Sequence, residues 1–169
     1  TGEASPDLLE DGVPPLLQAA LQGRRNAVRL GDTRPPAPGL QILRRAKERS
    51  TAVKQNAGAS LIDLGDGVLC VEFHSKMNTV GSDTIQMLQA GVHEASRSFS
   101  ALVVGNDAPN FSAGANLMHV LLEAQEEQWE KIDLMIQAFQ QATMALRYAD
   151  VPVIVAPAGL TLGGGCEIA

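Results

Sequence analysis

The stretch LTLGGGCEIA (160–169), with the earlier stretch FSAGANL (111–117), decides the fold of this 169-residue chain. Each stretch follows a short apolar run, contains glycine in a turn and leads into a predicted helix. Glycine lets the backbone adopt dihedral angles that other residues avoid and approach a ligand closely. A helix N-terminus presents unpaired backbone N–H groups and the positive end of the helix dipole. The two stretches therefore predict two backbone sites suited to an oxygen that carries negative charge.

The residues before these stretches alternate between predicted strands and helices. LIDLG (61–65) and VLCVEF (68–73) are short β-type runs, and Gly65-Asp66-Gly67 between them predicts a hairpin. Two further apolar strands are expected at 101–104 and 153–155, the second of them buried. Strands that alternate with helices predict an α/β fold in which helices cover a sheet.

Three helices are predicted between the strands. Ser82 or Asp83 can cap the first, in which Ile85, Leu88, Val92 and Ala95 recur at helical spacing. A loop at 106–115 leads to a short helix around 117–124, and a long amphipathic helix follows at 126–148. Its apolar stripe consists of Trp129, Ile132, Met135, Ile136, Phe139, Ala142 and Leu146.

Residues 1–59 differ in character from residues 60–169. Short helical patterns at 6–22 are interrupted by glycine and proline, and GDTRPPAPG (31–39) has the composition of a linker. A short helix is expected at 40–50, followed by a polar approach to the first strand. Residues 1–60 hold nine Lys and Arg against six Asp and Glu, whereas the remainder holds four against thirteen. This asymmetry indicates two segments of different origin.

Composition disfavours several classes of function. The net charge of −6, without aromatic residues near the basic stretch 44–54, argues against nucleic-acid binding. No apolar run is long enough to predict a membrane span, and no signal segment is seen. The two cysteines, Cys70 and Cys166, are expected to be reduced thiols in a cytoplasmic protein. The three histidines lack metal-ligand spacing, so no metal site is predicted.

Two N–H groups from the two glycine turns, aimed at one oxygen, would form an oxyanion hole. Glu167 follows Gly165 by two residues and is an acid placed to exchange protons nearby. Each piece alone has an ordinary structural explanation, since GGG often serves only to pack a strand against a helix. A glutamate near a helix start can also simply complement the helix dipole. Phosphate binding is disfavoured, because GGGCE lacks the Lys-Ser/Thr of a P-loop and does not match the dinucleotide fingerprint.

In this order, FSAGANL and LTLGGGCE resemble the two signature segments of the crotonase (enoyl-CoA hydratase/isomerase) superfamily. The similarity covers about residues 60–169 and includes VLCVEFHSKMNTVGSD (68–83). It implies a crotonase-like spiral of ββα units, truncated here at its C-terminus, in a protein that usually assembles as trimers or paired trimers. The chain has no initiator Met and ends inside a motif, so we expect a fragment of a longer protein.

Carried over by residue, the resemblance makes the backbone N–H groups of Ala115 and Gly164 the oxyanion donors and Glu167 a catalytic acid/base. A second catalytic glutamate of that family would lie beyond Ala169. Asn116 stands where the family commonly has Asp, which puts side-chain capping there in doubt. Lys76 is a candidate contact for the CoA phosphates, although an exposed lysine is more often simply solvated. The residues expected to bind substrate are Ala113, Gly114, Ala115, Gly163, Gly164 and Lys76.

The implied reaction is hydration of trans-2-enoyl-CoA to 3-hydroxyacyl-CoA in fatty-acid β-oxidation. Residues 1–59 resemble the tail and linker that follow a 3-hydroxyacyl-CoA dehydrogenase domain in fused proteins, which implies a bifunctional parent and a homo-oligomer. No cofactor is expected in this chain: coenzyme A is part of the substrate, and NAD would bind only the dehydrogenase domain. The alternatives are isomerisation or other enolate chemistry on a CoA thioester, or an inactive fragment that serves as linker and scaffold.

Overall fold

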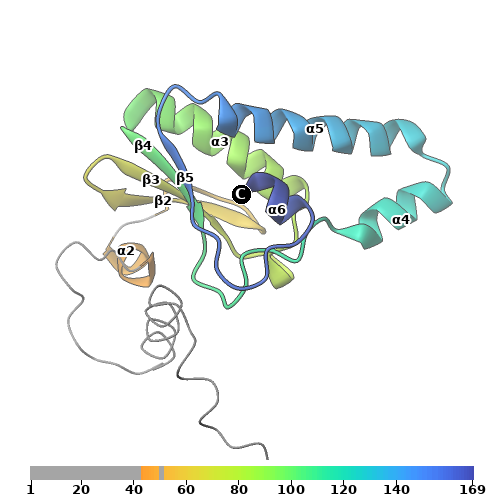
Figure 1. The fold of residues 1–169 in the computed structure, drawn as a ribbon, viewed down its shortest axis with the longest axis horizontal. Helices are drawn as coiled ribbons and strands as arrows, with labels where there is room; N and C mark the ends of the chain where they lie inside the picture. Colours follow the sequence, from red (N-terminus) through yellow and green to blue (C-terminus); the bar gives the residue numbers. More distant parts are fainter. Residues whose placement is uncertain (1–42, 50–51) are drawn as a thin grey trace, which may run out of the picture. The chain divides into compact units, whose positions relative to one another are not determined.

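The computed structural model describes residues 43–49 and 52–169, and these contain a five-stranded sheet in the order β1-β2-β3-β4-β5 (Figure 1). The first three strands pair antiparallel, and β3, β4 and β5 pair parallel. The helical patterns at 6–22 and the linker at 31–39 lie outside the described residues. The strands are β1 (Lys54–Gln55), β2 (Ala59–Gly65), β3 (Val68–Phe73), β4 (Ala101–Gly105) and β5 (Val153–Val155).

The predicted hairpin between β2 and β3 is confirmed. Gly65, Asp66 and Gly67 have φ values of 89°, 53° and 75°, which is the left-handed backbone that a tight hairpin turn requires. The strand β1 was not predicted: Lys54 and Gln55 are both exposed and pair with Leu61 and Ser60. A two-residue strand with no buried side chain leaves no apolar pattern in the sequence.

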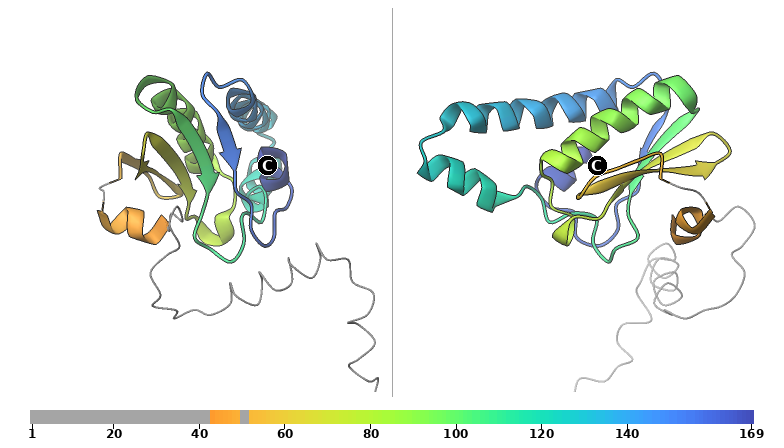
Figure 2. Two further views of the ribbon diagram at one scale, coloured as in Figure 1. Left: turned by 60° about the vertical axis from the view of Figure 1, so that its left-hand side comes forward. Right: turned by 180° about the vertical axis from the view of Figure 1, so that it is seen from behind.

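The helices lie on both faces of the sheet (Figure 2). On β3, Leu69 and Val71 point into the main core under α3, whereas Cys70 points to the opposite face and packs with Ala46 of α2. The helix α5 packs against α3 and contributes Ala142 and Leu146 to the core. The described helices are α2 (Leu43–Arg49), α3 (Ser82–Ser98), α4 (Leu117–Gln125), α5 (Trp129–Arg147) and α6 (Gly164–Ile168), with a 3₁₀ turn η2 at Lys76–Asn78.

The helix α3 packs unusually close to the sheet because residue 91 is a glycine. A Cβ at this position would stand 2.5 Å from Val71 Cγ2 and 3.2 Å from Leu61 Cδ2. The predicted apolar spacing is confirmed, since Leu88 and Ala95 are fully buried. The predicted cap is wrong: Gly81 is the N-cap, and Ser82 and Asp83 lie inside the helix without capping it.

Two predicted burials are corrected by the structure. The strand β5 is not buried, because it lies at the end of the described sheet and Ile154 is 59% exposed. The stripe of α5 is buried only in its second half: Trp129 at the first residue is 63% exposed. The helix begins at Trp129 rather than at 126, because Glu127 has a φ of 56°, a left-handed conformation that separates α4 from α5.

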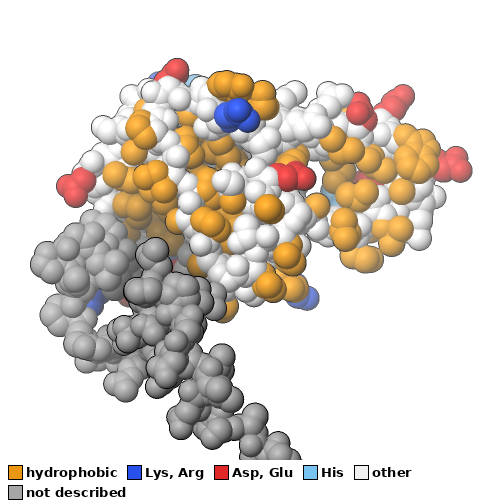
Figure 3. Space-filling view, viewed as in Figure 1, with side chains coloured by type: hydrophobic (Ala, Val, Ile, Leu, Met, Phe, Trp, Pro, Cys, Tyr) orange, Lys and Arg blue, Asp and Glu red, His pale blue; other side chains and the backbone are white. Residues whose placement is uncertain are grey.

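Apolar side chains gather on the exposed faces of α4 and α5 (Figure 3). No residue of α4 is buried, although the helix is mainly apolar. In the described ranges, no helix combines the length and apolar character needed to cross a membrane. Cys70 is buried and Cys166 is exposed, and both are free thiols.

Candidate active site

The two glycine turns, distant in sequence, lie in contact in the structure. Ser112 forms a parallel bridge with Thr161. The N–H of Ser112 donates to Leu160 O at 3.1 Å, and the N–H of Leu162 donates to Ser112 O at 3.0 Å. A Cβ at Gly114 would stand 3.6 Å from Gly163 Cα. The fold thus places the two predicted backbone sites beside each other.

The first turn leaves the N–H of Ala115 without an acceptor in the described part of the chain. The N–H groups of the adjacent residues all have acceptors. Ala113 N–H donates to Met77 O at 3.2 Å, and Asn116 N–H donates to Val80 O at 3.2 Å. Gly114 N–H donates to Ser112 Oγ at 3.0 Å. The Ala115 N–H is therefore available to a ligand oxygen.

The second turn has the same character. Gly165 N–H donates to Leu162 O at 2.9 Å, and Glu167 N–H donates to Gly163 O at 3.1 Å. The N–H of Gly164, the first residue of α6, finds no acceptor among the described residues. Gly164 packs against the ring of Phe139, where a Cβ would stand 3.4 Å from Cζ. Each turn therefore holds a backbone N–H without an acceptor among the described residues, that of Ala115 in the first and that of Gly164 in the second, where the N–H groups of Gly163 and Cys166 also have none.

Glu167 lies on α6, two residues after the second turn, and its side chain is exposed. It lines an open cleft of about 620 Å³ with the C-terminal half of α5 and with β5. Within the described ranges Glu167 is the only acidic side chain lining this cleft, and Ala115 and Gly164 do not line it. The neighbouring Leu160 and Leu162 are half exposed, whereas Ile168 is buried.

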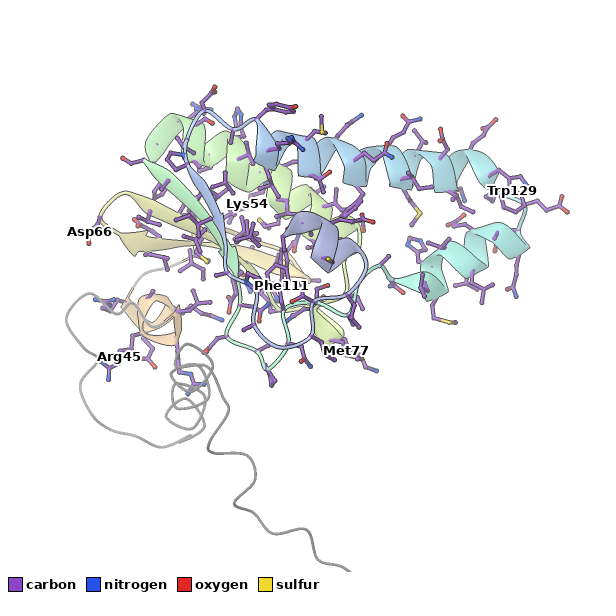
Figure 4. The ribbon with its side chains drawn as sticks, in the orientation of Figure 1. Arg45, Lys54, Asp66, Met77, Phe111 and Trp129 are labelled. Atoms are coloured by element: carbon purple, nitrogen blue, oxygen red, sulfur yellow. The ribbon has the colours of Figure 1, made fainter. Side chains whose placement is uncertain are left out.

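Lys76 belongs to η2, beside the first turn. The Ala113-to-Met77 hydrogen bond joins the two segments, and the side chains of Lys76 and Met77 are exposed. Met77 points away from the body of the domain, whereas Phe111 lies inside it (Figure 4). The structure therefore leaves the Lys76 ammonium at the surface next to the turn.

Two residues of this site were missed by sequence reasoning: Ser112 and Asn78. Ser112 is fully buried, and its hydroxyl donates to Asn78 O at 2.6 Å. The amide of Asn78, itself buried, donates to Asn110 O at 3.0 Å. A serine in a loop and an asparagine in a 3₁₀ turn carry no periodic signal, so only the contacts reveal them. In the described ranges, no group of three or more His, Cys, Asp or Glu side chains could hold a metal ion.

Comparison with known proteins identifies two relatives that each match about three quarters of this chain. The chain is 46% identical over 125 residues to the "Probable 3-hydroxyacyl-CoA dehydrogenase" of Bacillus subtilis (strain 168), covering 74% of this chain and 16% of that protein. It is 31% identical over 121 residues to the "Putative fatty acid oxidation complex trifunctional enzyme" of Rickettsia prowazekii (strain Madrid E), covering 72% and 17%. No family model matches the chain.

The crystal structure of an enoyl-CoA hydratase from Polaromonas sp. JS666 superposes with a TM-score of 0.61 at 19% identity, covering 66% of this chain and 44% of that one. The described fold is therefore that of the enoyl-CoA hydratases. FSAGANL and LTLGGGCE, the two segments that resemble the crotonase (enoyl-CoA hydratase/isomerase) signatures, lie in adjoining turns of this fold. The chain spans about a sixth of the length of the two relatives that it matches.

Proposed function

We propose that this chain supplies the thioester-binding half of a site that hydrates trans-2-enoyl-CoA to 3-hydroxyacyl-CoA. The observation that carries the proposal is the pair of unbonded N–H groups, on Ala115 and Gly164, in two turns that touch. Addition of water at C3 pushes negative charge onto the thioester oxygen. Backbone N–H groups fixed in advance stabilise that charge without reorganising, and losing one donor typically costs about 3–4 kcal/mol.

Glu167 is the acid/base of this proposal. It follows the second donor by three residues, on the same short helix. A carboxylate there would accept a proton from the attacking water, and its acid would return one to the α-carbon. Ala113, Gly114 and Gly163 shape the backbone around the donors, and Lys76 extends toward the CoA phosphates.

The cellular context forms part of the proposal. The names of the two relatives support a place in fatty-acid β-oxidation, within a bifunctional protein that also carries 3-hydroxyacyl-CoA dehydrogenase activity. NAD would then bind the dehydrogenase part and not this chain. We further propose a cytoplasmic homo-oligomer, as the resemblance to crotonases implies.

The test is Glu167→Gln in the full-length protein, with crotonyl-CoA as substrate. We expect hydration to fall at least about 100-fold, because proton transfer is lost. The Kd of a saturated acyl-CoA should stay close to that of the wild type, because the donors are intact. Glu130→Gln, at an exposed carboxylate in the first turn of α5, is the matched control and should keep full activity. Equal loss of binding and turnover would refute the role of Glu167, and conversion of 3-enoyl-CoA without hydration would make the protein an isomerase.

A further inference from the structure

Ser112 is the point at which three segments of the candidate site meet. Its side chain has an exposed fraction of 0%, although it carries a hydroxyl group. The hydroxyl donates to Asn78 O in η2 at 2.6 Å and accepts the N–H of Gly114 in the first turn at 3.0 Å. Its backbone pairs on both sides with the second turn, at Leu160 and Leu162. Both hydrogen-bonding roles of the buried hydroxyl are therefore filled.

We propose that Ser112 is a positioning residue that sets the direction and spacing of the two oxyanion donors; this rests on the function proposed above. Because the hydroxyl proton goes to Asn78 O, an oxygen lone pair is left to face Gly114 N–H. This bond fixes the peptide between Ala113 and Gly114, and Gly114 turns the chain with a φ of 91°. The following N–H, that of Ala115, is thereby held away from every internal acceptor of the described chain.

The backbone of Ser112 fixes the second donor in the same way. Its bridge to Thr161 holds the strand segment that enters the glycine turn. A Cβ at Gly165 would stand only 2.6 Å from Ser112 Cβ, so the start of α6 rests directly on this serine. One residue thus joins the support of both N–H groups, one through its side chain and one through its main chain.

The first test compares Ser112→Ala with Ser60→Ala in the full-length protein, using crotonyl-CoA. Ser60 of β2 is the matched control: it is also buried, its hydroxyl bonds His74 Nε2 at 2.8 Å, and neither residue belongs to the two glycine turns. For Ser112→Ala we expect kcat to fall about tenfold to 100-fold, because small misplacements of catalytic donors have costs of this size. KM should change by less than about threefold, and Ser112→Cys, which keeps a weak donor and acceptor, should recover part of kcat.

The second test probes the two N–H donors with a bound ligand that does not turn over. Acetoacetyl-CoA ionises to an enolate with a strong ultraviolet band, and an oxyanion hole raises the enolate fraction of the bound ligand. Ser112→Ala should lower that fraction at saturating ligand, whereas Ser60→Ala should not. A purely structural role for Ser112 would lower the melting temperature and leave the enolate fraction of the folded protein unchanged.

Unchanged kcat and enolate fraction in Ser112→Ala would overturn the proposal while leaving the hydratase function standing. A wild-type protein that neither hydrates crotonyl-CoA nor stabilises the enolate would instead refute the proposed function itself. If Ser112→Ala does not fold, Ser112→Gly, which also lacks the hydroxyl group, carries the comparison, and a kcat equal to that of the wild type overturns the positioning role.

Discussion

Gly114 and Gly163 face each other across the two turns of the site. A Cβ at Gly114 would stand 3.6 Å from Gly163 Cα and 3.0 Å from Leu162 O. Gly114 also has a φ of 91°, which L side chains rarely adopt. The contact between the turns therefore depends on glycine for two separate reasons, one conformational and one steric.

Gly114→Ala is expected to abolish most activity and to destabilise the protein by about 1–3 kcal/mol. The control is Gly65→Ala, because Gly65 has nearly the same φ of 89° but nothing within 4 Å of a Cβ. Both variants suffer the conformational strain, and only Gly114→Ala pushes the turns apart. Urea unfolding and steady-state kinetics separate the two effects; equal kinetics in both variants would show that the contact is unimportant for activity.

Gly91→Ala tests the close approach of α3 to the sheet. Alanine normally favours a helix over glycine by about 1 kcal/mol. Here its Cβ would meet Val71 Cγ2 at 2.5 Å, so we expect net destabilisation of about 1–3 kcal/mol. Val71→Ala should relieve the clash, making the double variant more stable than the sum of the single losses predicts. Strict additivity in urea unfolding would count against this reading.

Lys47 and Glu72 form an ion pair at 2.8 Å that ties α2 to β3. The Glu72 side chain is 4% exposed and that of Lys47 is 44% exposed, so Lys47→Met leaves a buried carboxylate without its partner. We expect a loss of about 1–3 kcal/mol, and recovery in Lys47→Met/Glu72→Leu to within about 1 kcal/mol of the wild type. Lys54→Met, at an exposed lysine of β1, controls for the loss of charge and should be neutral. An equally neutral Lys47→Met would show that the pair adds no stability.

The two thiols should differ sharply in reactivity. Burial, and to a smaller extent the nearby Glu72 carboxylate, raise the pKa of Cys70 from 9.0 to about 12, and Lys47 partly opposes them. Iodoacetamide should therefore modify exposed Cys166 in the native protein and reach Cys70 only after denaturation, as peptide mapping would show. Modification of native Cys70 at a similar rate would contradict the burial.

The raised pKa of Cys70 lowers the free energy of unfolding at alkaline pH. The folded thiol holds its proton between pH 9.0 and about 12, where the unfolded thiol loses it. Its contribution to stability is therefore complete below pH 9 and is lost as pH rises through that window, by up to about 1.4 kcal/mol per pH unit. Cys70→Val should reduce this alkaline decline, measured as the pH dependence of the unfolding free energy. If the unfolding free energy of Cys70→Val falls at alkaline pH as steeply as that of the wild type, other groups cause the fall.

Local chemistry made part of the fold predictable. Gly65-Asp66-Gly67 predicted its hairpin because few residues adopt such dihedral angles, and α3 followed from the recurrence of Leu88 and Ala95. The exposed β1 and the capping by Gly81 left no comparable signal. Burial of Ile154 was predicted wrongly, because an apolar run does not reveal whether another element covers it.

The two turns of the candidate site were predictable from the sequence, whereas their meeting at one oxygen was a hypothesis that local pattern could not establish. The glycines and the helix start after them marked where free N–H groups occur. That Gly114 touches Gly163 depends on the packing of the whole domain, and the role of buried Ser112 depends on contacts with η2.

The parallel pairing of β3, β4 and β5 has a consequence for the order of folding. The hairpin of β2 and β3 closes through a tight turn. By contrast, α3 lies in the chain between the paired strands β3 and β4, and α4 and α5 lie between β4 and β5. Contacts across such separations form slowly, because the chain must first give up loop entropy. The bond from Leu160 N–H to Asn110 Oδ1 joins residues 50 positions apart. The site would thus be among the last parts to form in a chain leaving the ribosome, and recovery of thioester binding would report that folding is complete.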